Sequence, residues 1–216
     1  MKSKIVLVFL SIFLVVGSSY GQSEPEPNMN TRTFTSLKNA LKNPEIVTRI
    51  DLSNQEVQLT DAVLKQFKNI EFLSLKNDNL QEVPHGIMYL KKLKVLDLSG
   101  NEIEKLPRFL KKLTNLEEIY LNDEKNLDVD QSIGILTKLP KLKSLHLEGD
   151  HLKVIPKRVS KLNFLESLYL TNNDIKELPR NIKLPKNLKL IDLKMNEIGK
   201  QIDKENRFGK GLIIEL

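Results

Sequence analysis

The sequence predicts an α/β fold, a solenoid built from stacked repeats. Three observations predict it. Apolar residues recur with a period of 23 residues from Val47 onward, proline recurs late in several periods, and Asn or a related polar residue recurs at the ninth position. Apolar positions one, four and six fit neither a helix face nor one long strand. They fit one coil of a solenoid, in which a strand, a corner and a return segment share an interior.

The repeats follow one another along most of the chain. The first apolar position of each coil falls at Val47, Ile70, Leu93, Leu116, Leu142, Leu165 and Leu188. The steps are 23 residues long, except for one step of 26 residues from Leu116 to Leu142. A further step of 23 reaches Gly211, where GLIIEL has the pattern of one more strand. We therefore predict seven repeats over residues 47–210 and the terminal strand of an eighth over residues 211–216.

The ninth position of each coil is polar, and its chemistry predicts where the fold is least regular. An Asn amide both donates and accepts, so it satisfies backbone groups exposed where the chain leaves the strand. The position holds Gln55, Asp78, Asn101, Glu124, Asp150, Asn173 and Asn196. Because an ionised carboxylate cannot donate, we expect the second, fourth and fifth coils to be more irregular than the others. The alternative is that water satisfies the unmet groups.

The first residues have the features of an export signal. Lys2 and Lys4 form a short basic region, residues 5–16 are almost wholly apolar, and Ser19 and Gly21 place small residues before a cleavage site at Gln22. The sequence thus predicts a signal peptide over residues 1–21 and an exported protein that is secreted, periplasmic or at the cell surface. The apolar run is shorter than the ~20 residues that span a bilayer. An uncleaved anchor is the alternative.

A linker and a cap are expected between the signal and the repeats. Residues 22–30, QSEPEPNMN, are polar and proline-bearing, as linkers are. Over residues 31–46 the sequence predicts a capping helix, with Thr33 or Thr35 as its N-cap and Pro44 as its stop. The apolar residues at helical spacing in it are Phe34, Leu37, Ala40 and Leu41. Such a helix would cover the core that the first coil otherwise exposes.

The repeat pattern LxxLxLxxNxLxxLP, plainest in residues 93–115, resembles the 23-residue class of leucine-rich repeats, and the resemblance covers about residues 47–216. The order of signal, short helix ending in Asn-Pro, and repeats resembles exported bacterial leucine-rich repeat proteins such as those of spirochaetes. The resemblance implies a curved solenoid with a parallel β-sheet on its concave face and short helical, 3-10 or extended return segments on its convex face. It also implies that the concave face binds another protein.

The concave face carries the candidate binding residues. Strand alternation places positions three, five and seven on it, since positions four and six point inward. Tyr120, His146 and Tyr169 occupy position five in consecutive coils. Three rings side by side predict a binding platform, because Tyr is enriched at interface hot spots. The alternative is that ring stacking only stiffens the sheet.

Other residues of positions three and seven complete the predicted binding set: Glu118, Glu148, Asn122 and Phe72. Glu118, Glu148 and Asn122 flank the rings and would select a basic or hydroxyl-bearing partner. Basic residues instead gather on the return segments, which predicts either attraction to an anionic envelope or glycan surface or an ordinary solvated face.

The segment HLEGDH, residues 146–151, suggests a metal site but does not support one. Zinc needs three or four converging ligands, whereas side chains on one flat strand diverge. We expect no metal site there.

Part of the 26-residue coil matches the sequence pattern of a calcium-binding loop. Asn126, Asp128 and Asp130 match its start, but Gln131 and Thr137 stand where Gly and Glu are required. A bulged loop is expected instead.

Catalysis finds no support in the sequence. There is no Cys, only three His are present, and no nucleophile and base fall into a known arrangement. No glycine-rich phosphate loop suggests a cofactor. Removal of two signal lysines lowers the formal charge from +6 to about +4, too mild by itself for a nucleic-acid partner.

Two functions remain open. The first is an exported, non-catalytic protein-binding module that uses its concave face. The second is a structural or self-associating cell-envelope protein, because GLIIEL forms an apolar edge strand that invites pairing with another chain.

Overall fold

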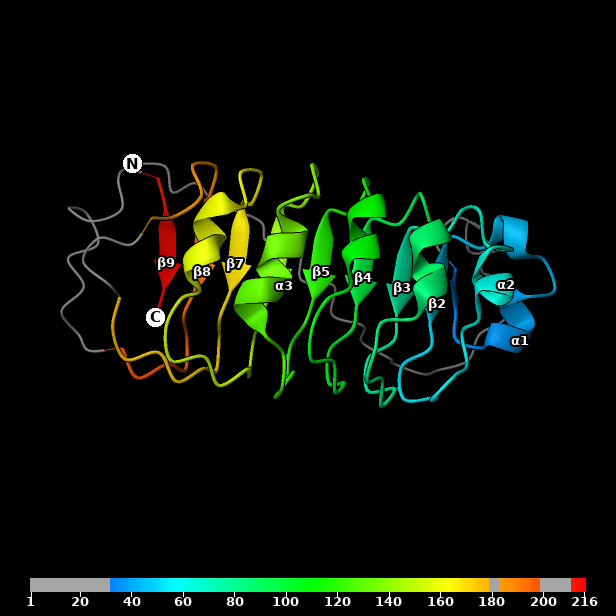
Figure 1. The fold of residues 1–216 in the computed structure, drawn as a ribbon, viewed down its shortest axis with the longest axis horizontal. Coiled ribbons are helices and arrows are strands. Elements are labelled where there is room, and N and C mark those ends of the chain that lie inside the picture. Colours follow the sequence, from blue (N-terminus) through cyan, green and yellow to red (C-terminus); the bar gives the residue numbers. More distant parts are fainter. Residues whose placement is uncertain (1–31, 179–182, 199–210) are drawn as a thin grey trace, which may run out of the picture.

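The structure, a computed structural model, describes residues 32–178, 183–198 and 211–216. In these residues nine strands form one parallel sheet in chain order, eight of them in the predicted repeats and the first at residues 33–34, where the sequence predicts a helix. The strands are β1 Thr33–Phe34, β2 Arg49–Asp51, β3 Phe72–Ser74, β4 Val95–Asp97, β5 Glu118–Tyr120, β6 Ser144–His146, β7 Ser167–Tyr169, β8 Leu190–Asp192 and β9 Ile213–Glu215. Figure 1 shows them side by side along the long axis of the molecule. The expected signal peptide and linker lie outside the described residues.

Each coil places equivalent residues at the same height in the sheet. Leu96 of β4 pairs with Leu73 of β3 and with Ile119 of β5, and the same register continues to β9. Leu93, Leu96 and their equivalents at positions one, four and six are buried in all seven coils that begin between Val47 and Leu188. Each coil covers the core of its neighbours, so the hydrophobic stabilisation belongs to the stack and not to one repeat.

Three return segments that carry the repeated proline form 3-10 helices, and two that lack it form α-helices. Pro84, Pro107 and Pro156 are each the N-cap residue of a 3-10 helix, and none makes a side-chain cap because proline has no polar side-chain atom. These helices are η2 His85–Tyr89, η3 Arg108–Lys112 and η4 Lys157–Lys161. Two coils without the proline form the α-helices α2 Asp61–Leu64 and α3 Val129–Leu136, capped by the side chains of Thr60 and Asp128.

Helix α3 corrects the expectation of a bulged loop in the 26-residue coil. Asp128 accepts a hydrogen bond from the backbone N–H of Gln131, and Val129, Ile133 and Leu136 bury one apolar side of the helix. Their spacing of four and three residues is helical. The three extra residues therefore lengthen a return segment into two helical turns.

The N-terminal segment also differs from the single helix expected over residues 31–46. Strand β1 pairs with β2, and only Leu37–Ala40 forms an α-helix (α1), followed by the 3-10 helix η1 Pro44–Ile46. Ser36 is the N-cap, so the assignment of Thr33 or Thr35 to that role is wrong. Pairing with the otherwise open edge of β2 favours the extended form of Thr33.

Asparagines at position nine link consecutive coils. Oδ1 of Asn101 accepts hydrogen bonds from the backbone N–H groups of Asp78 and Leu80, each 3.0 Å long. Its Nδ2 donates to the carbonyls of Leu75 and Leu98. Both halves of the amide are therefore used, as the sequence predicts.

Acidic residues at position nine satisfy only part of this pattern. Oδ1 of Asp150 accepts from the N–H of Glu124 at 2.9 Å, but its buried Oδ2 has no hydrogen-bond partner among the described residues, and Asp78 has the same defect. Burial raises the pKa of Asp150 to about 8 and that of Glu124 to about 7. The strands of the second, fourth and fifth coils keep the same register as the others. The irregularity expected for these coils is therefore absent from the sheet, and in the second and fifth coils its counterpart is the unpaired carboxylate oxygen at position nine.

Within the described part of the chain, no helix is long and apolar enough to cross a membrane.

Candidate functional site

Positions three, five and seven line one face of the sheet, which we call the open face. Position five brings Tyr120, His146 and Tyr169 together from β5, β6 and β7. The ring centroids of Tyr120 and His146 are 3.9 Å apart with planes at 18°, and those of His146 and Tyr169 are 4.2 Å apart at 7°. We call these three side chains the ring stack. His146 in its middle is only 8% exposed, whereas both tyrosines are half-buried.

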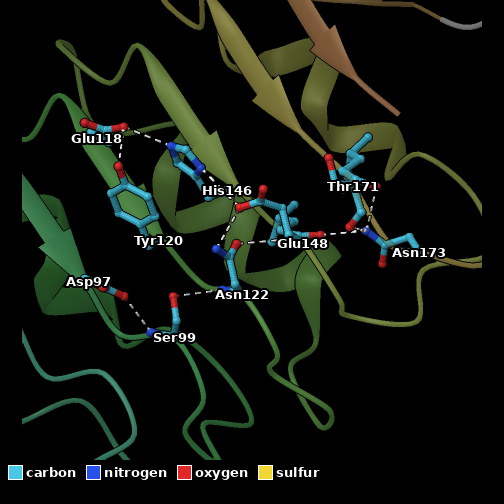
Figure 2. A network of polar contacts seen from close by, with 11 residues as sticks. Asp97, Ser99, Glu118, Tyr120, Asn122, His146, Glu148, Thr171 and Asn173 are labelled. Atoms are coloured by element: carbon cyan, nitrogen blue, oxygen red, sulfur yellow. Dashed lines mark hydrogen bonds and ion pairs between the residues drawn. The ribbon is translucent and has the colours of Figure 1, made fainter. Parts of the chain in front are cut away.

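Two carboxylates hold the middle ring from opposite ends. Nε2 of His146 lies 2.9 Å from Oε1 of Glu118, and Nδ1 lies 3.4 Å from Oε2 of Glu148. The Tyr120 hydroxyl donates to the same Glu118 oxygen at 2.9 Å, and Nδ2 of Asn122 donates to Glu148 at 2.7 Å. Figure 2 shows this network on adjoining strands. The structure thus brings all three predicted flanking residues to the rings.

The network sets the charges of its members. Burial alone would lower the pKa of His146, but its contacts with Glu118 and Glu148 outweigh burial and raise that pKa. The hydrogen bond from His146, reinforced by Tyr120, lowers the pKa of Glu118. Burial, with the nearby charge of Glu118, raises the pKa of Tyr120 well above its usual range. The arrangement favours an imidazolium between two carboxylates and two neutral phenols.

Stacking changes what the rings offer to a partner. Both faces of His146 are covered by tyrosines, the Tyr120 hydroxyl is bonded to Glu118, and the stack leaves the outer faces of Tyr120 and Tyr169. The shared position of the three residues in consecutive repeats predicts that the rings are adjacent. It does not predict how the rings pack, because ring orientation depends on side-chain torsions and on Glu118 and Glu148.

Phe72 lies apart from the ring stack, on β3, two strands before β5. Its ring is covered by the guanidinium of Arg49, whose central carbon is 4.1 Å from the ring centroid. The structure therefore does not bring Phe72 together with the other predicted binding residues.

Position two carries a ladder of charges that the sequence reasoning missed. Glu and Lys alternate there over six coils, at Glu71, Lys94, Glu117, Lys143, Glu166 and Lys189. The pairs Lys94–Glu71 and Lys143–Glu117 are each 2.8 Å long, and Lys189 bonds to Glu166. Reading that column along the repeats would have found it. Exposed pairs of this kind stabilise weakly, and they compete with any partner that approaches this edge of the sheet.

The segment HLEGDH is divided between different environments. His146 and Glu148 belong to the open face, Asp150 bonds the backbone of Glu124, and His151 lies 3.4 Å from Asp174. Among the described residues, no group of three or more His, Cys, Asp or Glu side chains is placed to hold a metal ion.

A groove of about 720 Å³ lies among the return segments, beside η3 and α3. Arg108, Phe109, Ile135 and Arg158 contribute to its lining. Gly134 leaves room for the Arg158 guanidinium, since a Cβ there would meet Nη1 at 2.7 Å. This groove is the main rival to the open face as a binding surface.

Comparison with known proteins supports the repeat assignment. Residues 68–125 match the family model described as leucine rich repeat. No curated protein sequence matches the chain. A chain in the structure of the Drosophila Toll–Spatzle complex is 19% identical with a TM-score of 0.55, and the match covers 71% of this chain but 24% of that one.

A leucine-rich repeat protein of Leptospira interrogans is 24% identical with a TM-score of 0.42, the match covering 77% of this chain and 59% of that one. This chain thus spans less than two thirds of either protein. The family model shows leucine-rich repeats over residues 68–125, and the same positions recur in seven coils of one parallel sheet, so the described part of the chain is a leucine-rich repeat solenoid.

Proposed function

We propose that the protein is a non-catalytic binding module that holds another protein on its open face, at the ring stack. Leucine-rich repeat proteins generally bind other proteins, which supports this class. The choice of site rests on one observation. Glu118 and Glu148 hold His146 in place from two sides, and a tyrosine stacks on each face of its ring. Side chains held in place before binding lose little entropy when a partner arrives.

Capture by the purified protein tests the proposal. The double variant Tyr120→Ala/Tyr169→Ala removes the aromatic edges while keeping His146, and it should lose the captured protein while its circular dichroism stays unchanged. Tyr89→Ala is the matched control, because Tyr89 lies in η2 among the return segments. Capture that survives in the double variant would place the site elsewhere.

The proposal includes export and the organisation of the chain. Residues 1–21 would be the signal, 22–30 a linker, 31–46 a cap over the first coil, 47–210 the seven repeats and 211–216 the terminal strand of an eighth. Packing of Phe34, Leu37 and Leu41 against the core supports the cap. Mass spectrometry of the exported protein should find an N-terminus at Gln22, and an intact Met1 would contradict cleavage.

The second candidate function is self-association in the cell envelope through β9. Ile213 is 57% exposed and Leu216 50% exposed, and β9 is the last strand in the sheet of described residues. Light scattering at rising concentration should then detect a dimer that Ile213→Lys abolishes. A strict monomer would exclude this function.

A further inference from the structure

The geometry points to two guanidinium-binding slots, one at each end of the ring stack, and so to a partner segment that presents two arginines. This inference rests on the proposed function of the open face. It adds the chemistry of the partner, which the fold alone does not give.

Each end of the ring stack faces an aspartate. Asp97 of β4 is the neighbour of Tyr120, and Asp192 of β8 is the neighbour of Tyr169 in the same column. The inner face of each tyrosine lies against His146, so the outer face is turned toward the aspartate. Figure 2 shows Asp97 on the side of Tyr120 away from His146. Each slot therefore combines one aromatic face with one carboxylate, the two features that hold a guanidinium.

Neither aspartate is long enough to fill its slot. Oδ1 of Asp97 accepts the backbone N–H of Ser99 at 2.9 Å, and Oδ1 of Asp192 accepts that of Lys194 at 3.0 Å. One oxygen of each aspartate is therefore held by its own strand, and among the described residues neither aspartate is hydrogen-bonded to the tyrosine beside it. The second oxygen of Asp97 has only a long contact of 3.4 Å with Ser74 Oγ.

The open face already holds one guanidinium in this manner. Arg49 and Phe72 are neighbours at position three of β2 and β3, and the guanidinium lies 4.1 Å from the ring centroid. Adjacent strands thus give the spacing that stacking of a guanidinium on a ring requires. The two slots have the same spacing but contain no arginine of this chain in the described residues.

The two slots are not equivalent. Nζ of Lys194 lies 3.5 Å from Asp192 and 2.5 Å from Glu215, so a cation of the chain itself partly neutralises the second slot. Asp97 has no such competitor among the ion pairs of the described residues. The Asp97 slot should bind more strongly.

Strand spacing sets the distance between the two arginines. The slots are separated by three inter-strand spacings of ~4.8 Å, or about 14 Å, which about four residues of extended chain span. The matching partner segment is extended and carries arginines four residues apart, lying across the strands.

Fluorescence anisotropy of a labelled Gly/Ser peptide with two arginines four residues apart tests this directly. Asp97→Asn should weaken binding about tenfold and Asp192→Asn about threefold, which correspond to about 1.4 and about 0.65 kcal/mol, the range expected for a stacked and paired guanidinium. Asn keeps the bond to the Ser99 or Lys194 N–H. Asp51→Asn is the matched control: Asp51 occupies the same column and accepts the Ser53 N–H, but its neighbour is Ser74 and not a tyrosine.

Three results would overturn the inference: no binding of the peptide, an equal loss in Asp51→Asn, or equal binding of the peptide with lysines in place of arginines. The last would indicate general charge attraction without stacking. If the peptide fails while Tyr120→Ala/Tyr169→Ala still loses a captured protein, the proposed function stands and only the slots are wrong. If neither variant set changes anything, both fail.

Discussion

Nε2 of His146 lies 2.9 Å from Oε1 of Glu118, across the boundary between β5 and β6. The same carboxylate oxygen accepts the Tyr120 hydroxyl, so one acidic side chain orients two rings of neighbouring coils. A surface residue is thereby converted into a structural one, because His146 is buried although it occupies a column that faces solvent.

Replacing His146 by Phe should lower the free energy of unfolding by about 2 kcal/mol at pH 6. Phe keeps a stacked ring but leaves Glu118 and Glu148 without their shared cation. The raised pKa of His146 means that its stabilisation is fully present below its usual value of 6.5 and is lost as the pH rises through the folded value. Urea unfolding at pH 6 and pH 9 should therefore show a smaller difference at pH 9.

His85→Phe is the matched control for that variant. His85 also contacts a carboxylate, Asp61 at 3.0 Å, but its side chain is 58% exposed. Its replacement should change stability by less than about 0.5 kcal/mol. Equal effects of the two substitutions would show that burial of His146 contributes nothing.

Asp150→Asn should stabilise the protein by about 1–2 kcal/mol at pH 7, because the neutral amide supplies a donor at the unpaired oxygen without the proton uptake that Asp150 requires on folding. Asn173, one coil later, shows the result: its Nδ2 donates to the carbonyls of Leu147 and Leu170. The reverse change Asn173→Asp should destabilise by a similar amount. Urea midpoints measure both, and a less stable Asp150→Asn would contradict the account of position nine.

The stability of the protein should fall as the pH rises from 5 to 8. The pKa of Asp150 is raised from 3.8 to about 8, so the folded state holds a proton that the unfolded state releases near pH 4. Stability from this group is full below about pH 4 and declines as the pH approaches 8. Glu124, with its pKa raised to about 7, acts in the same direction.

Asp150→Asn separates this effect from that of other groups. Thermal midpoints of the variant should decline less than those of the original protein over the same pH range. Parallel curves for the two proteins would show that Asp150 is ionised in the folded state at neutral pH.

Met195→Asn should raise the free energy of unfolding by about 1 kcal/mol. Met195 has a φ of 55°, in the left-handed region, where a backbone with this side chain is strained, and it is 74% exposed. Burial of the side chain therefore does not offset the backbone strain. The equivalent position in other coils holds residues that tolerate this conformation: Asn54, Asn77, Gly100, Asp123, Gly149 and Asn172, all with positive φ. A lower thermal midpoint would indicate that Met195 makes a stabilising contact.

Most of the fold could be predicted because the same apolar positions recur in every repeat. One coil such as residues 93–115 is ambiguous, but seven coils in one register fix which residues face inward, and Leu96, Leu98 and their equivalents are buried as predicted. Departures from the repeat were harder to predict. The return segment of the 26-residue coil is an example. Its apolar residues Val129, Ile133 and Leu136 have helical spacing, but the pattern spans only two turns and follows a polar segment that is typical of a loop.

The candidate site could be predicted by position but not by geometry. Column alignment places Tyr120, His146 and Tyr169 together and adds Glu118, Glu148 and Asn122. It does not reveal that His146 is buried or that the inner face of each tyrosine is stacked on it. Those features follow from hydrogen bonds between residues 26 to 28 apart in sequence, which no local pattern contains.

The central claim is that partner binding depends on the ring stack and not on the groove beside η3. The most direct measurement is the dissociation constant of the captured partner for the original protein, for Tyr120→Ala/Tyr169→Ala and for Phe109→Ala, which alters the groove. Loss of two hot-spot rings should weaken binding at least about 30-fold, whereas Phe109→Ala should leave it unchanged. A loss confined to Phe109→Ala would contradict the claim.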